Sequence, residues 1–335
     1  MKPKSCNPYN KLMSVLVFAE NWDGKFKKQS FELVTYARKM AEMLGTSVTV
    51  LSIGNVSDED LKALGKYGAD RIVKVSGERY TALDNQIYTS VIAQVADTEN
   101  AGVLILAHNN TGKAVAPRLS VRLKAGLASG VNSLPAGKDN FIVSKKVFSG
   151  KAFASVRIKS ERKIITLSQN SFGISESPVN AAIVNLVPEH DQAVAAAAVR
   201  DVQKQAGKII LTDAEIVVSG GRGMKSPDNW GPLEELAGIM GAALACSRPV
   251  SDEGWRPHEE HTGQTGKIIA PNLYMAFGIS GAIQHLAGVS SSKCIVAVNT
   301  DKNAPIFEAA DYGVVGDAQK VLPDLIREIR AVKNQ

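Results

Sequence analysis

Residues 274–287 read YMAFGISGAIQHLA, an apolar run, a glycine-containing turn and a helical pattern in direct succession. The run 274–277 predicts a buried strand, and 280–287 predicts the helix that follows it. Gly278 and Gly281 allow the backbone to turn sharply and to approach a ligand closely. A strand that leads through such a turn into a helix is typical of a parallel sheet with helices on its faces.

The same alternation extends from this stretch to both ends of the C-terminal part of the chain. We expect strands at 215–218, 274–277, 294–299 and 312–315, and helices at 232–245, 280–287 and 318–332. Residues 208–335 are therefore predicted to form one α/β domain.

The N-terminal part shows a second α/β pattern. Strands are expected at 14–19, 48–53, 71–75 and 103–107, and helices at 30–44 and 84–96, with a short helix opened by a capping box of Ser57 and Asp60. Residues 141–167 alternate between polar and apolar residues, which predicts antiparallel strands that cap this domain. We predict a flexible leader at 1–12, an α/β domain at 13–190 and a linker at 191–207. The predicted fold class is α/β, with two domains that are each built on a mainly parallel sheet flanked by helices.

Composition narrows the functional classes. The 335 residues include three widely spaced cysteines, Cys6, Cys246 and Cys294, so neither a disulfide nor a cysteine metal site is expected, and a cytoplasmic setting fits. The net charge of +6 is scattered along the chain, which gives no indication of a nucleic-acid partner. No apolar run is long enough to span a bilayer, so no membrane insertion is expected.

Familiar catalytic motifs are absent from the sequence. There is no GxGxxG, GxSxG or HExxH, so we predict no catalytic residue and no metal site. Instead, glycine-rich turns follow two expected strands, SGGRG at 219–223 and GISG at 278–281. Ligands of open α/β sheets bind at the carboxyl ends of strands, and a helix N-terminus favours a pyrophosphate. Arg222 would add a cation for the same phosphates.

Further polar residues occur at related positions. CSRPV places Ser247 and Arg248 after the expected helix 232–245, and TGQTG at 262–266 forms a polar loop. Asn299 and Asp317 follow two other expected strands. Taken singly, each residue also suits an ordinary structural role, because Ser280 and Asp317 suit helix N-caps and Asn299 suits a turn.

In combination these segments resemble the alpha subunit of an electron transfer flavoprotein. The resemblance rests on SGGRGMKS, CSRPVSDEGW, HTGQTGKIIAPNLYMAFGISGAIQHLAG and VAVNTDKNAPIFEAADYGVVGD, in unbroken order over about 213–330. The first domain is similar to the family through SVLVFAE and TGKAVAPRL, and departs from its usual pattern at KKVFSGKA and LSQNSFG.

The resemblance implies an FAD site in the C-terminal domain. Arg222 would lie near the phosphates, Ser247 at the cofactor and Arg248 against the flavin ring. The ring would be lined by Thr262, Gly263, Gln264 and Thr265, with the Thr265 hydroxyl near flavin N5. The middle of FAD would be wrapped by Ser280, Gly281, Ala282, Ile283, Gln284 and His285, with His285 directed at flavin O2. Asn299 would contact the ribityl–phosphate region, and Asp317 and Ala318 the adenosine end.

The resemblance also implies an electron carrier without substrate turnover of its own, working through an anionic flavin semiquinone. Its expected partners are a beta subunit that holds AMP or a second FAD, flavin dehydrogenases such as the acyl-CoA dehydrogenases of fatty acid beta-oxidation as donors, and a quinone oxidoreductase as acceptor. The alternatives are the flavin subunit of an electron-bifurcating complex, a flavin dehydrogenase with its own substrate, and an adenine-nucleotide sensor, which the βαβ pattern of the first domain suggests.

Overall fold

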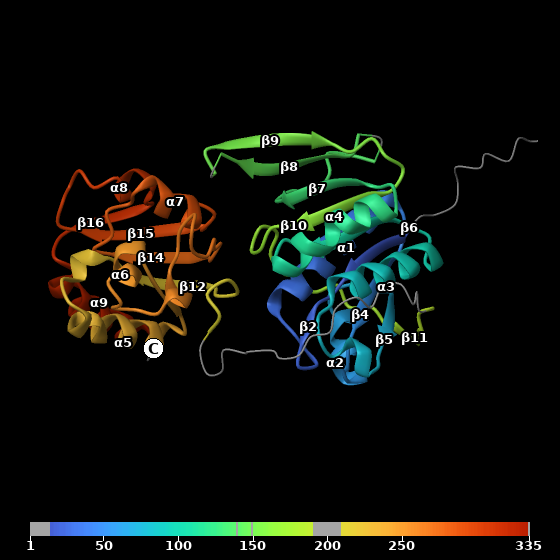
Figure 1. Ribbon diagram of the computed structural model, residues 1–335, viewed down its shortest axis with the longest axis horizontal. Coiled ribbons are helices and arrows are strands. Elements are labelled where there is room, and N and C mark those ends of the chain that lie inside the picture. Colours follow the sequence, from blue (N-terminus) through green and yellow to red (C-terminus); the bar gives the residue numbers. More distant parts are fainter. Residues whose placement is uncertain (1–13, 139, 149, 190–208, 334–335) are drawn as a thin grey trace, which may run out of the picture. The chain divides into compact units, whose positions relative to one another are not determined.

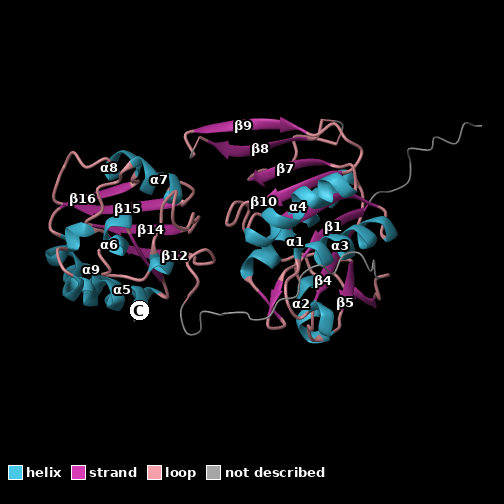
Figure 2. Ribbon diagram, in the orientation of Figure 1, coloured by secondary structure: helices cyan, strands magenta, loops and turns pink. Residues whose placement is uncertain are grey.

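The computed structural model describes residues 14–138, 140–148, 150–189 and 209–333 (Figure 1). The predicted leader at 1–12 and linker at 191–207 lie outside the described residues. The chain divides into two compact units, one of Met1–Lys146 and Phe153–Val202 and the other of Val147–Ala152 and Gln203–Gln335. Each unit is an α/β structure in which helices flank a mainly parallel sheet (Figure 2), which confirms the predicted fold class.

The first unit contains a nine-stranded sheet in the order β11-β5-β4-β1-β6-β10-β7-β8-β9. The strand pairs from β11 to β7 are parallel, and β7 pairs with β8 antiparallel. A short antiparallel ribbon of β2 and β3 stands apart from this sheet. The strands are β1 (Ser14–Phe18), β2 (Asn21–Trp22), β3 (Lys25–Phe26), β4 (Val48–Ile53), β5 (Arg71–Val75), β6 (Ala101–Ala107), β7 (Gly126–Val131), β8 (Ile142–Val147), β9 (Ala152–Arg157), β10 (Lys163–Leu167) and β11 (Ala182–Asn185).

Helices cover both faces of this sheet. α1 (Lys28–Leu44) and α2 (Asp58–Gly65) bury their apolar residues on one face. On the other face, α3 (Asn85–Thr98) and α4 (Asn110–Arg122) pack in a second core, and a single 3₁₀ turn, η1 (Glu78–Tyr80), precedes α3. The central strands β1, β4 and β6 are buried along their whole length, because their alternate side chains point into these two cores.

Local sequence signals set several helix ends. α1 ends at Gly45, which adopts the left-handed conformation (φ +71°) that glycine reaches without a steric penalty. The Ser57 hydroxyl accepts the backbone N–H of Asp60, so Ser57 is the N-cap of α2, and the Asp60 carboxylate accepts the Ser57 hydroxyl rather than its backbone N–H as a capping box would. The Asp84 carboxylate caps α3 by accepting two backbone N–H groups.

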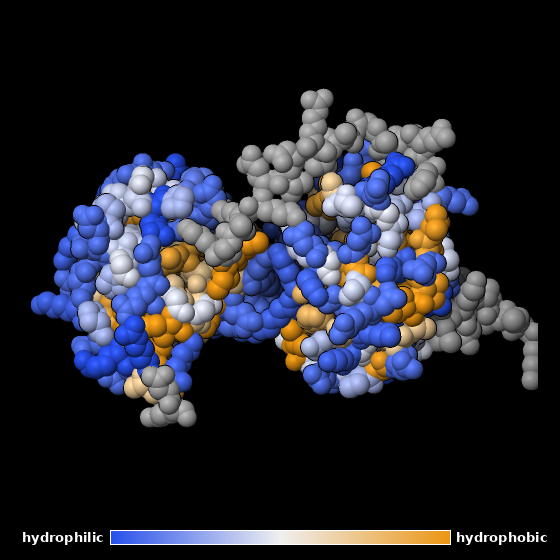
Figure 3. Space-filling model, turned by 90° about the horizontal axis from the view of Figure 1, so that it is seen from below, coloured by the Kyte–Doolittle hydropathy of each residue, from blue (hydrophilic) through white to orange (hydrophobic). Residues whose placement is uncertain are grey.

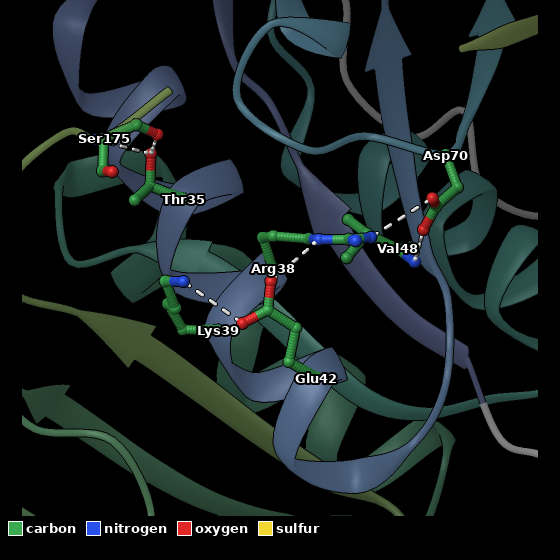
Figure 4. A network of polar contacts seen from close by, with 7 residues as sticks. All are labelled: Thr35, Arg38, Lys39, Glu42, Val48, Asp70 and Ser175. Carbon is green, nitrogen blue, oxygen red and sulfur yellow. Dashed lines mark hydrogen bonds and ion pairs between the residues drawn. The ribbon is translucent and has the colours of Figure 1, made fainter. Parts of the chain in front are cut away.

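A polar network fastens α1 to the adjoining chain (Figure 4). The Asp70 carboxylate accepts the backbone N–H of Val48 at 2.8 Å and pairs with Arg38 at 3.3 Å. Arg38 and Lys39 both pair with Glu42 on the same helix. These contacts join α1 to the start of β4 and the loop before β5.

The structure corrects the prediction of antiparallel strands through 141–167. β10 lies between β6 and β7 and is parallel to both. The reason is that its sequence, KIITL, is a nearly continuous apolar run with four buried residues, which suits a central parallel strand rather than an amphipathic edge strand. α4, β7 and β11 were not predicted from the sequence.

The second unit is built on a five-stranded parallel sheet in the order β13-β12-β14-β15-β16. α5 (Gly231–Met240) and α9 (Ala318–Lys333) pack on one face, and α7 (Ile283–Val289) and α8 (Ile306–Ala309) pack on the other. The remaining elements are β12 (Ile216–Gly220), η3 (Arg222–Met224), η4 (Pro227–Trp230), β13 (Ala243–Cys246), α6 (Arg248–Asp252), η5 (His258–Glu260), β14 (Leu273–Phe277), β15 (Cys294–Asn299) and β16 (Tyr312–Val315).

Two predicted helices of the second unit have different bounds. The expected helix at 232–245 ends at Met240, because Gly241 adopts a left-handed conformation (φ +62°) and the following residues form β13 beside β12. The expected helix at 280–287 begins only at Ile283, because Gly281 has φ +83° and Ala282 is extended in ψ. The second difference lengthens the loop that leaves the carboxyl end of β14.

Candidate functional site

The second sheet reverses its strand order between β12 and β14. The chain runs from β12 outward to β13, returns to the other side of β12 as β14, and continues outward to β16. Open α/β sheets bind their ligands at the carboxyl ends of the strands beside such a reversal. The loops that leave β12 and β14 at this point are the two glycine-rich segments, 219–223 and 278–281.

These two loops cross with backbone against backbone. A Cβ atom on Gly221 would lie 2.2 Å from the carbonyl oxygen of Gly278, and one on Gly223 would lie 2.7 Å from the Cα of Gly278. The Gly223 N–H donates to the Gly278 carbonyl at 3.0 Å. Only glycine fits at this crossing, which brings the polar backbone groups of both loops to one point.

The turn after β14 presents unpaired amide groups. Within the described residues, the backbone N–H groups of 280–284 donate no hydrogen bond, and Ala282 caps α7 without a side-chain acceptor. Four of these five residues are exposed, namely Ser280, Ala282, Ile283 and Gln284. A row of amide donors that lacks protein acceptors fits an anion such as a pyrophosphate.

The 261–267 loop is held against α7. The Thr262 N–H donates to the Cys246 carbonyl at the end of β13, and the Gln264 N–H donates to the Gln284 carbonyl at 2.7 Å. A Cβ atom on Gly288 would lie 2.5 Å from the Cα of Gly263, so this loop and α7 touch through their backbones. The structure therefore brings predicted residues 262–265 beside predicted residues 280–285, with Gln264 and Thr265 exposed.

The two predicted arginines lie near α6. Arg248 is its first residue, with a side chain that is 63% exposed and an Nε 3.2 Å from Asp252 Oδ2. Arg222 is similarly exposed and lies 3.8 Å from Glu253. Exposed ion pairs of this kind cost little to break, so both guanidinium groups are available to an anionic ligand. Ser247 and Arg248 were predicted to follow a helix, but they follow the strand β13, because the chain is extended after Gly241.

The predicted residues near the other strand ends have structural partners. Asn299 donates from Nδ2 to the Ile279 carbonyl at 2.9 Å, which ties the end of β15 to the 278–281 turn. The Asp317 carboxylate accepts the Gln319 N–H and pairs with Lys225 at 2.8 Å, and the hydrogen bond from Lys225 lowers its pKa. Ala318 is buried in the core. Contacts of these three residues with a cofactor stay a prediction.

His285 is buried behind this edge of the sheet. Its Nε2 lies 2.7 Å from the hydroxyl oxygen of Tyr274, and within the described residues its Nδ1 has no hydrogen-bond partner. Burial lowers the pKa of His285 to about 4, although the backbone of Thr262 opposes this shift. The imidazole is therefore neutral near pH 7, and its Nδ1 is a buried atom that forms no hydrogen bond with the described residues.

Two polar residues of this region were not predicted from the sequence. Tyr274 is fully buried in β14, and His261, the first residue of the 261–267 loop, is 2% exposed. The Nδ1 of His261 also lacks a partner among the described residues, and its ring lies 5.4 Å from that of His258. The signal for Tyr274 was a hydroxyl inside an apolar strand, because a buried hydroxyl needs a partner.

The donor set fits a flavin dinucleotide, since it combines unpaired amides for a pyrophosphate, exposed cations and an imidazole nitrogen without a partner among the described residues. Residues 15–213 match the family model for the electron transfer flavoprotein domain, and residues 210–290 match that for the electron transfer flavoprotein FAD-binding domain. The chain is 36% identical over 322 residues to the electron transfer flavoprotein subunit alpha of Syntrophomonas wolfei, covering 94% of this chain and 98% of the relative. The chain belongs to the electron transfer flavoprotein alpha-subunit family.

Other members of this family are similarly close. The electron transfer flavoprotein subunit alpha of Bacillus subtilis is 35% identical, with 94% of this chain and 97% of the relative covered. The acryloyl-CoA reductase electron transfer subunit beta of Anaerotignum propionicum is 32% identical, with 97% and 98% covered. A decarboxylase structure from Rhodococcus jostii RHA1 aligns with a TM-score of 0.24 and 10% identity, covering 95% of this chain and 59% of that one, which is too low to bear on the fold.

Membership gives the coarse role of the chain. It is an electron transfer flavoprotein subunit, and its cofactor is FAD. Among the described residues, no group of histidine, cysteine, aspartate and glutamate side chains could hold a metal ion. No helix in the described ranges is both long and apolar enough to cross a membrane.

Proposed function

We propose that this chain, completed by a beta subunit, holds FAD at the carboxyl ends of β12, β14 and β15 in a cytoplasmic electron carrier. Electrons would come from flavin dehydrogenases such as acyl-CoA dehydrogenases and pass to a quinone oxidoreductase or another acceptor. Bound FAD supplies the one-electron chemistry of this carrier. The row of unpaired amides at 280–284 carries the proposal, because it offers anion donors at the reversal of the sheet.

Each part of the site has a distinct role in this proposal. The amides of 280–284 and the Arg222 guanidinium hold the phosphates. The 262–265 loop lines the flavin ring, and Arg248 places a cation beside it. A charge pair at about 4 Å contributes about 1 kcal/mol in water and about 4 kcal/mol at an effective dielectric of 20. Since Arg248 is more than half exposed, we expect its contribution to lie near the lower figure.

The beta subunit would cover apolar surface around these loops. Ile268 follows the 261–267 loop and is 57% exposed, and Ile283 begins α7 and is 70% exposed. Hydrophobic residues are visible on the surface of the second unit in Figure 3. Exposed apolar side chains beside a cofactor site favour a partner that buries them. We expect this partner to carry AMP or a second FAD of its own.

A reductive titration tests the proposal. The chain is produced together with its beta subunit, and visible spectra are recorded during stepwise reduction. Flavin bands in the wild-type complex support the proposal, and a colourless complex that cannot be reconstituted with FAD overturns it. Arg248→Ala should keep the fold and lower the one-electron potential, whereas Arg327→Ala, which removes an arginine of similar exposure from α9, should change nothing. Equal potentials for the two variants would contradict the role of Arg248.

Two alternatives to the proposed carrier differ from it in the number of flavins or in the electron acceptor. An electron-bifurcating complex would hold a second FAD in the beta subunit, so two flavins per heterodimer would favour it over a carrier with AMP. Similarity to an electron transfer subunit of acryloyl-CoA reductase favours, as a second candidate, delivery of electrons to a CoA-thioester reductase. Reoxidation rates with a quinone oxidoreductase and with such a reductase would separate the two acceptors.

The first unit gives little support to the adenine-nucleotide sensor. Its strand order reverses between β1 and β6, where a phosphate would bind. The Glu20 carboxylate follows β1 at this point and accepts hydrogen bonds from Asn109 at 2.6 Å and Thr111 at 2.8 Å. A carboxylate that occupies the donors at the start of α4 repels a phosphate.

A further inference from the structure

The Tyr274 hydroxyl pairs with the imidazole of His285, the residue that the resemblance directs at flavin O2, and Tyr274 itself has no part in the binding contacts described so far. Tyr274 lies in β14 and is completely buried, and His285 lies in α7 and is 7% exposed. The two side chains meet at 2.7 Å between Tyr274 Oη and His285 Nε2. A hydrogen bond this short between two buried groups fixes the orientation of the imidazole.

Both partners are uncharged at neutral pH. Burial lowers the pKa of His285 to about 4 and raises the pKa of Tyr274 above its ordinary value. A neutral imidazole carries a single N–H, on either Nδ1 or Nε2, and the partner of one nitrogen determines which. The hydrogen bond to Tyr274 therefore decides the tautomer of His285.

The chemistry of the two groups favours one direction for this bond. A phenol hydroxyl is a good donor and a poor acceptor, while an unprotonated imidazole nitrogen is a good acceptor. When Tyr274 donates to Nε2, the proton of His285 lies on Nδ1, the nitrogen that has no partner among the described residues. The opposite direction would leave a bare lone pair at Nδ1 and would repel an electron-rich ligand.

We propose that Tyr274 is a positioning residue whose hydroxyl holds Nε2 of His285 and thereby keeps a hydrogen-bond donor at Nδ1 for the flavin. This inference rests on the FAD site of the proposed function. Tyr274 would act only through His285. Its loss should weaken the preference of the site for reduced over oxidised FAD about tenfold, which is about 59 mV for a one-electron couple.

The tautomer can be measured without the cofactor. In the full-length chain labelled with ¹⁵N-histidine, NMR distinguishes a protonated ring nitrogen from an unprotonated one. We expect Nε2 of His285 to be the unprotonated nitrogen in the wild type, and the proton to move to Nε2 in Tyr274→Phe, which keeps the ring and removes the hydroxyl. A wild-type signal with Nε2 protonated, or an unchanged tautomer in Tyr274→Phe, would overturn the inference.

A matched variant controls for the loss of a buried hydroxyl. Tyr36 is also fully buried, and its hydroxyl donates to the Ser133 carbonyl at 2.8 Å in the first unit. Tyr36→Phe should lower stability while leaving the His285 tautomer and the flavin potential unchanged. A shift of either by Tyr36→Phe would mean that any lost buried hydroxyl disturbs the site, which contradicts a specific role for Tyr274.

A double-mutant cycle then tests whether Tyr274 acts through His285. In the heterodimer reconstituted with FAD, Tyr274→Phe should lower the flavin potential in the wild-type background and have no further effect in the His285→Ala background. Additive shifts in the two backgrounds would refute positioning. If the wild-type complex binds no FAD, the proposed function is wrong. The NMR measurement is made without FAD and tests the hydrogen bond between Tyr274 and His285 separately.

Discussion

Gly221→Ala adds a single methyl group at the crossing of the two glycine loops. Gly221 has φ −109°, which alanine adopts without strain, so the substitution tests the close approach alone. The new Cβ would lie 2.2 Å from the Gly278 carbonyl oxygen and 2.8 Å from the Cα of Ile279, whereas ordinary contacts begin near 3.4 Å. The two loops must separate by about 1 Å, and overpacking against rigid atoms costs about 1–3 kcal/mol. Because the atoms that clash belong to the backbone, we expect a cost of about 3 kcal/mol, at the upper end of that range.

The same displacement should affect cofactor binding. Gly278 begins the turn that carries the unpaired amides of 280–284, so its movement shifts several donors at once. A loss of about 1.4 kcal/mol corresponds to tenfold in affinity, and we expect FAD to bind at least tenfold more weakly. Stability is measured by urea unfolding with tryptophan fluorescence, since Trp230 and Trp255 both lie in the second unit. Affinity is measured by FAD titration of the heterodimer.

Gly238→Ala is the matched control in the same unit. Gly238 lies inside α5, and nothing lies within 4 Å of the position of its added Cβ. Alanine in a helix interior stabilises by about 0.5–1 kcal/mol relative to glycine, so this variant should shift stability in the opposite direction. If Gly221→Ala unfolds at the wild-type urea concentration and binds FAD normally, the backbone crossing is not as close as described.

Two further predictions concern charge in the second unit. Arg256 is only 14% exposed and pairs with Glu234 and Glu260, so Arg256→Ala should lower the free energy of unfolding by about 3 kcal/mol in the same urea assay. Arg330 forms an exposed ion pair, so Arg330→Ala should lower it by less than about 1 kcal/mol. Because the pKa of His285 is about 4 in the folded chain against an ordinary 6.5, the unfolded chain binds its proton first. The contribution of His285 to stability should therefore be constant above pH 6.5 and fall by up to about 3 kcal/mol between pH 6.5 and 4. A His285→Gln variant that shows the same slope would disprove this source.

Most of the fold could be predicted from local pattern. β4, β5, β15 and β16 occupy the predicted residues, because each is short, rich in valine, isoleucine or tyrosine, and bounded by polar residues or glycine. The errors arose where tertiary pairing outweighed local pattern. The residues ALAC of β13 continue a helical pattern after α5, and only their pairing with β12 makes them a strand. The position of β10 depends on its two neighbours, 103–107 and 126–131, which are distant in sequence.

The site was predictable in outline and not in its contacts. The glycine loops can be found in the sequence because clustered glycine directly after an apolar strand is typical of a sharp turn beside a ligand. The sequence does not show that Asn299 fastens the 278–281 turn or that Lys225 pairs with Asp317, since both contacts join segments that meet only in the folded unit. The pairing of Tyr274 with His285 was missed for a similar reason, because a tyrosine within an apolar run gives no indication of its partner.

The place of β10 in the first sheet affects how the protein is made. The strands β6 and β7 gain β10 as a neighbour only after residues 163–167 have left the ribosome, and β5 gains its outer neighbour only with residues 182–185. Until then the nascent chain exposes unpaired edges of strands that are paired on both sides in the finished sheet, and such edges promote aggregation. Slow translation or a premature stop between β7 and β10 should therefore leave a species that depends on chaperones, although it already contains most of the helices of the first unit.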